Sequence, residues 1–131
     1  FKGQLTTTHA DLVQLYRMVT QVTGKKAVPY YSSYGCYCGL RGRGRPKDAT
    51  DRCCQRHDCC YGQLQKWGCR PHITSYSYRY GQGKIQCGER CQEACSCDRA
   101  LALCLKQNAR WYQKKYTFYP NFLCRGPSLS C

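Results

Sequence analysis

The chain has 131 residues, a length that suits one compact domain and excludes two ordinary ones. It has no run of about 18 apolar residues, which excludes a membrane-spanning segment. Fourteen residues are cysteine, a share above the roughly 8–10% that marks a disulfide scaffold, so we expect seven disulfides and a secreted, extracellular protein. Lys and Arg number 21 against 7 Asp and Glu, and the formal net charge of +14 favours anionic partners such as membranes, sulfated glycans or nucleic acid.

The first predicted element is an amphipathic helix over residues 11–23. Apolar side chains recur there at helical spacing between polar ones, and Gly24 stops the helix. The apolar set is Leu12, Leu15, Tyr16, Val19 and Val22. Residues 1–10 have no such period, so we expect an N-terminal extension or loop, propeptide-like in character, ahead of a single domain over 11–131.

Glycine and cysteine dominate the next part of the chain. Four glycines and a proline within 34–46 predict an irregular loop. A helix is expected over about 48–66, with Asp48 or Thr50 as its cap. This helix contains the stretch DRCCQRHDCCYG, which puts four cysteines, a histidine and two aspartates into residues 51–62.

The second half of the chain carries a hairpin, a helix and a tail. Alternating tyrosines in 75–87, with a turn at 81–83, predict a β-hairpin. Helical spacing returns over about 89–107 and places Asp98 on a face shared with cysteines and leucines. The tail over 108–131 contains two prolines and is expected to be extended. The expected fold is therefore mainly α and disulfide-rich, with an amphipathic N-terminal helix, a glycine loop, two long helices and a small hairpin.

Cysteine spacing predicts how the two longer helices meet. Cys53 and Cys60 are seven residues apart, as are Cys97 and Cys104, so each pair lies on one face of its helix. If the helices are antiparallel, two disulfides clamp them face to face. The pairs would be Cys53–Cys104 and Cys60–Cys97.

His57 lies midway between the clamped positions, and the same register brings it to Asp98. A histidine oriented by a buried carboxylate is the arrangement of a general base. Tyr61 lies one turn further along and could donate a hydrogen bond to the same carboxylate. A helix histidine on its own is more often a surface or structural residue, but inside this clamp we favour catalysis.

Asp58 points to a different side of the helix from its neighbour His57, towards the glycine loop over 35–44. Loop carbonyls and a bidentate carboxylate together suit a hard cation, and calcium is the usual extracellular one. A plain turn without a metal is the alternative.

Zinc binding and thiol redox chemistry fit the cysteine-rich stretch less well. Its adjacent cysteine doublets diverge around a helix and do not suit one zinc ion. A thioredoxin-type C-x-x-C motif needs a βαβ context, which is absent from the sequence. Disulfides remain the best interpretation.

Three motifs resemble those of the secreted phospholipases A2, closest to group II. The stretch YGCYCG (34–39) resembles the calcium loop, DRCCQRHDCCY (51–61) the catalytic signature, and CSCD (95–98) the motif of the second long helix. The resemblance extends from about residue 11 to Cys131 and implies that the hairpin is the β-wing of that fold. It also implies calcium-dependent hydrolysis of the sn-2 ester of glycerophospholipids.

The resemblance assigns catalytic roles to individual residues. His57 would deprotonate the attacking water, and Asp98 would hold the imidazole with hydrogen bonds from Tyr61 and Tyr76. The amide of Gly39 would contact the oxyanion.

The resemblance also implies a Ca²⁺ site and seven disulfides. The calcium ligands would be Asp58 and the carbonyls of Tyr37, Gly39 and Arg41. The implied pairs are Cys36–Cys124, Cys38–Cys54, Cys53–Cys104, Cys59–Cys131, Cys60–Cys97, Cys69–Cys91 and Cys87–Cys95.

The sequence departs from the family pattern in three places. Arg41 stands where the calcium loop normally has glycine, Tyr16 occupies a usually small position beside the acyl channel, and residues 1–10 precede the usual start of the enzyme. These departures keep a second class open, a catalytically weak or silent basic phospholipase A2-like protein that binds membranes, glycans or mineral. The retained catalytic set favours activity.

The expected partner is a phospholipid surface. The stretch RGRGRPK (41–47) supplies four cations near the mouth of the channel, so anionic membranes should bind best. Heparin-like glycans are a further candidate. Nucleic acid is not expected, because no nucleic-acid fold motif accompanies the charge. Nothing in the sequence indicates an oligomeric state.

Overall fold

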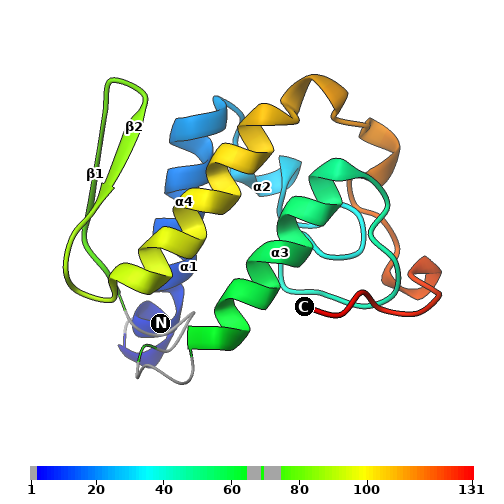
Figure 1. Ribbon diagram of the computed structural model, residues 1–131, viewed down its shortest axis with the longest axis horizontal. Helices are drawn as coiled ribbons and strands as arrows, with labels where there is room; N and C mark the ends of the chain where they lie inside the picture. Colours follow the sequence, from blue (N-terminus) through cyan, green and yellow to red (C-terminus); the bar gives the residue numbers. More distant parts are fainter. Residues whose placement is uncertain (1–2, 65–68, 70–74) are drawn as a thin grey trace.

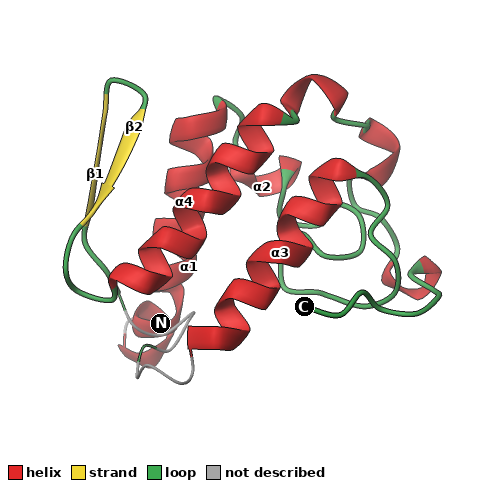
Figure 2. Ribbon diagram, in the orientation of Figure 1, coloured by secondary structure: helices red, strands yellow, loops and turns green. Residues whose placement is uncertain are grey.

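Three long helices frame the protein, and a hairpin and a tail of short turns complete it (Figure 1, Figure 2). The computed structural model describes residues 3–64, 69 and 75–131. The helices are α1 (Gly3–Thr23), α2 (Ala27–Tyr30), α3 (Ala49–Leu64) and α4 (Gln92–Gln107), the strands are β1 (Tyr78–Gly81) and β2 (Lys84–Cys87), and the 3-10 turns are η2 (Ala109–Trp111), η3 (Lys114–Tyr116) and η4 (Asn121–Leu123). None of the helices in these ranges is both long and apolar enough to cross a bilayer.

The long helices α3 and α4 lie side by side and run in opposite directions (Figure 1). Disulfides Cys53–Cys104 and Cys60–Cys97 join them, so the clamp predicted from the cysteine spacing is confirmed. The other five predicted pairs are also present, and all fourteen cysteines are bonded. In the chain-entropy view each crosslink contributes roughly 2–4 kcal/mol by restricting the unfolded chain.

Helix α1 packs its apolar face against α4. Leu15, Val19 and Val22 of the predicted stripe are buried, and Gly24 ends the helix with a φ of 77° and a hydrogen bond from its N–H to Thr20 O of 2.9 Å. The prediction of a loop over residues 1–10 was wrong from Gly3 onward, because α1 starts there. That segment lacks proline, and a helix once nucleated extends at one hydrogen bond per residue even without an apolar period.

The hairpin was predicted correctly. Strands β1 and β2 pair antiparallel with Tyr80 opposite Ile85, and Gln82 and Gly83 form the turn with φ angles of 51° and 74°. The tail after α4 differs from the extended form that we predicted, because η2, η3 and η4 interrupt it. Its Tyr112 packs on Tyr30, Tyr31 and Tyr34, and this aromatic packing favours local turns over an extended chain.

A buried carboxylate fixes the glycine loop to the start of α3. Asp51 is fully buried and accepts hydrogen bonds from the N–H groups of Cys36 (2.8 Å), Tyr37 (2.8 Å) and Lys47 (2.7 Å). The predicted cap Asp48 is confirmed, since its Oδ1 accepts the N–H of Asp51 at 2.9 Å. The structure of 34–46 is irregular, as predicted, and this carboxylate organises it.

Replacing Asp51 with Ala should destabilise the protein by about 3 kcal/mol or more, because three buried N–H groups would lose their acceptor. Guanidinium unfolding of the disulfide-intact protein measures the change. Arg52→Ala is the matched control, since Arg52 is exposed on the same turn and should change stability by less than about 0.5 kcal/mol. Equal stability of the two variants would contradict the role given to Asp51.

Candidate active site

His57 of α3 and Asp98 of α4 form the predicted contact at the centre of the helix clamp. His57 Nε2 lies 2.7 Å from Asp98 Oδ1, and the exposed fractions of the two residues are 8% and 0%. Because Nε2 faces the carboxylate, the imidazole is held with Nε2 as its N–H and Nδ1 as the free acceptor nitrogen. A buried, oriented imidazole of this kind suits proton abstraction.

Two tyrosines complete the surroundings of Asp98. Tyr61 donates its hydroxyl hydrogen to Oδ1, and Tyr76 donates to Oδ2 at 2.5 Å. Both tyrosines were predicted as partners of this carboxylate. Three groups thus contact the carboxyl oxygens of Asp98, and this network fixes the ring of His57.

Gln14 positions one of these tyrosines, and sequence reasoning missed it. Its Nε2 donates to Tyr76 O at 2.6 Å, and its Oε1 accepts the N–H of Tyr76 at 3.2 Å. The side chain therefore completes a two-bond bridge from α1 to the segment before β1. Its place among the polar residues of the first helix gave no signal of this role.

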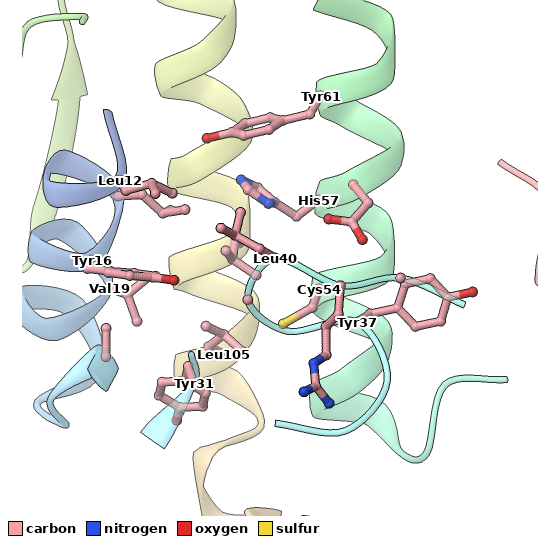
Figure 3. A pocket seen from close by; sticks show the side chains of 17 residues that line it. Leu12, Tyr16, Val19, Tyr31, Tyr37, Leu40, Cys54, His57, Tyr61 and Leu105 are labelled. Atoms are coloured by element: carbon pink, nitrogen blue, oxygen red, sulfur yellow. The ribbon is translucent and has the colours of Figure 1, made fainter. Parts of the chain in front are cut away.

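His57 opens onto an apolar cavity of about 410 Å³ (Figure 3). This volume falls in the range of roughly 300–1,000 Å³ that is usual for small-molecule sites. Its walls come mainly from α1, α3, α4 and the glycine loop, and the apolar residues that line it include Leu12, Leu15, Tyr16, Val19, Leu40, Leu101 and Leu105. An alkyl chain placed here would extend away from the imidazole between α1 and α4.

Tyr16 narrows this cavity from the α1 side. Its ring lies between Leu12 and Val19, and its hydroxyl projects into the space (Figure 3). Burial raises the pKa of Tyr16, so the phenol stays neutral. Tyr16, which we expected beside the acyl channel, therefore does line the cavity.

Oxygen atoms suited to a hard cation lie beside His57. Asp58 lines the same cavity, and its side chain forms no hydrogen bond or ion pair with another described residue. Burial, and then the charge of Asp51, raise the pKa of Asp58 to about 7. A half-buried carboxylate without a side-chain partner among the described residues fits a site whose charge is completed by a cation.

The loop supplies further oxygens for such a cation. The carbonyls of Tyr37, Gly39 and Arg41 accept no hydrogen bond from any described residue, and all three residues line the cavity. At Gly42 a Cβ would lie 3.0 Å from Asp58 Oδ2, so the loop backbone closely approaches the carboxylate. Since no group of three or more His, Cys, Asp or Glu side chains in the described ranges could hold a metal ion, backbone oxygens would have to complete the site. Calcium accepts such a donor set.

The backbone at position 39 leaves no room for a side chain, so this residue must be glycine. Its φ is 90°, and a Cβ there would lie 1.9 Å from Ser32 O. Its N–H donates to no described residue, so this donor remains free. Arg41, by contrast, is absent from the few described non-glycine residues with positive φ, and its backbone accommodates a side chain without strain.

A family model described as phospholipase A2 matches residues 12–117 of this helical, disulfide-clamped chain. The chain belongs to the phospholipase A2 family. It is 54% identical to basic phospholipase A2 trimucrotoxin of Protobothrops mucrosquamatus, over 92% of this chain and 88% of the relative. It is 51% identical to basic phospholipase A2 VRV-PL-VIIIa of Daboia russelii, over 92% of this chain and all of the relative.

A further relative is named a homolog of the basic phospholipases A2. Bothropstoxin-II of Bothrops jararacussu is 50% identical over 92% of this chain and 88% of the relative. The family predicted from the three motifs is thus confirmed, as is the mainly helical fold with seven disulfides. A phospholipase A2 crosslinked in this way is a secreted protein.

Proposed function

We propose that this phospholipase A2 hydrolyses the sn-2 ester of glycerophospholipids at anionic membrane surfaces in a calcium-dependent reaction. The products would be a fatty acid and a lysophospholipid. The contact between His57 and Asp98, at 2.7 Å beside an apolar cavity, carries this proposal. It supplies an oriented base at the end of a space suited to an alkyl chain.

His57 serves as the general base in this proposal. Asp98 holds Nε2, so Nδ1 accepts the proton of a water molecule as that water attacks the ester carbonyl. The same nitrogen then returns the proton to the departing lysophospholipid oxygen. Tyr61 and Tyr76 keep the carboxylate in place throughout.

Asp58 and the carbonyls of Tyr37, Gly39 and Arg41 would hold Ca²⁺. Bound calcium supplies Lewis-acid polarisation of the ester carbonyl. The free N–H of Gly39 donates a hydrogen bond to the same oxygen as negative charge develops there.

The loop at the cavity mouth provides the contact with anionic lipid. Leu40 is 71% exposed, and Arg43 and Arg45 are exposed beside it. Each cation near an anionic leaflet adds about 1 kcal/mol of attraction. Heparin-like glycans would compete for the same charge.

A fatty-acid release assay tests the proposal. The protein should release the sn-2 fatty acid from vesicles containing anionic phospholipid only when calcium is present, and more slowly from purely zwitterionic vesicles. The assay should compare the intact chain with a form cleaved before Asp11, because we propose that residues 1–10 are a removable extension. Activity of the cleaved form alone would identify a proenzyme. Absence of calcium-dependent release from both forms would refute the proposed activity.

The second candidate is a catalytically weak basic protein that binds membranes, glycans or mineral. Tyr16 inside the cavity favours it, because the phenol occupies space that an acyl chain needs. Binding to anionic vesicles without turnover, together with turnover restored by Tyr16→Ala, would support this candidate.

A further inference from the structure

Arg41 ties the loop that carries it to the C-terminal tail. Its Nη1 donates to Gly35 O at 2.9 Å and to Tyr119 O at 2.6 Å. The first bond connects residues 35 and 41 within the glycine loop, and the second crosses to the tail. One guanidinium group therefore links three points of the backbone.

The two acceptors of Arg41 belong to segments that are already paired. Gly35 donates its N–H to Tyr116 O at 2.9 Å, and Tyr119 donates its N–H to Ser33 O at 3.2 Å. The side chain of Arg41 thus adds a hydrogen bond to the two backbone hydrogen bonds that already join the loop to the tail.

Between Gly35 and Arg41 lie two of the carbonyls assigned to the cation, and Arg41 carries the third. Ordering a free loop around an ion opposes binding by the conformational entropy that is lost. A loop that is already held in shape loses less on binding, so the ion binds more tightly.

We propose that Arg41 is a positioning residue that holds the loop over 35–41 in its cation-binding shape before any cation arrives. This inference rests on the proposed function, since it concerns the same site. The charge of Arg41 opposes a nearby cation, but its guanidinium is directed to the carbonyls of Gly35 and Tyr119, which offset that charge locally. We infer that the ordering effect exceeds the repulsion.

Substituting Arg41 with Met tests this positioning role, because methionine keeps an unbranched side chain but has no hydrogen-bond donor. In the calcium-free protein, hydrogen exchange of the hydrogen-bonded amides of Tyr37 and Cys38 should become at least tenfold faster. A calorimetric calcium titration should show affinity about three- to tenfold weaker than in the unmodified protein. Arg41→Lys retains the charge and a nitrogen that can donate to both carbonyls, so its exchange should stay closer to that of the unmodified protein than the exchange of the Met variant.

Arg45→Gln is the charge-matched control. Arg45 is exposed in the same loop, and its side chain forms no hydrogen bond with a described residue, so both readouts should stay at their native values. Tighter calcium binding by the Arg41→Met variant, or hydrogen exchange equal to that of the unmodified protein, would overturn the positioning role proposed for Arg41. Failure of the unmodified protein to bind calcium would instead refute the proposed function, and the titration distinguishes the two results.

Discussion

Replacing His57 with Gln is expected to lower the turnover of sn-2 esters by about 10²–10⁴-fold, the usual contribution of a general base. Glutamine can still donate a hydrogen bond to Asp98 but cannot accept the proton of water. Because the disulfides on both sides of His57 remain, the thermal unfolding temperature should change little. Initial rates on anionic vesicles with saturating calcium measure the effect.

Arg56→Gln is the matched control for this substitution. Arg56 precedes His57 on α3, and its side chain is exposed. Its loss should leave the chemical step unchanged and weaken only binding to anionic vesicles. A His57→Gln variant that keeps native turnover would exclude the imidazole as the base.

Replacing Asp58 with Asn is expected to weaken calcium binding by about 100-fold or more, because affinity follows the number of charged ligands and Asp58 is the single carboxylate assigned to the site. The turnover of sn-2 esters should fall together with the calcium affinity. Without calcium, this variant should be at least as stable as the native protein, since burial raises the pKa of Asp58 to about 7 and so disfavours its charged form. Calorimetric titration and thermal unfolding in a chelator give the two measurements.

Glu93→Gln supplies the control for Asp58→Asn. It removes one negative charge from an exposed position in the first turn of α4 and should leave calcium affinity unchanged. If the Asp58→Asn variant bound calcium with native affinity, the cation would have to bind elsewhere. The proposed polarisation of the ester carbonyl by calcium at this site would then be excluded.

The helix clamp could be predicted because a repeat of seven residues fixes which cysteines share a helix face. The same register predicts that His57 meets Asp98, and the structure has this contact. Local signals also sufficed for the hairpin and the cap Asp48, since each depends on neighbours in the sequence.

Contacts between distant segments could not be predicted in the same way. Gln14 meets a segment 62 residues away, and Arg41 reaches Tyr119 across 78 residues. Polar side chains of this kind have many possible acceptors, and only the folded path of the loops selects one. The helical start of α1 at Gly3 was missed for a different reason, because it shows no amphipathic pattern.

The two disulfides between α3 and α4 flank His57, each about one turn away along α3. The proposed chemistry thus relies on crosslinks that form and persist in oxidising surroundings. If a strong thiol reductant opened both crosslinks, the imidazole would lose its fixed distance to the carboxylate. The proposed lipid cleavage therefore depends on both crosslinks remaining closed.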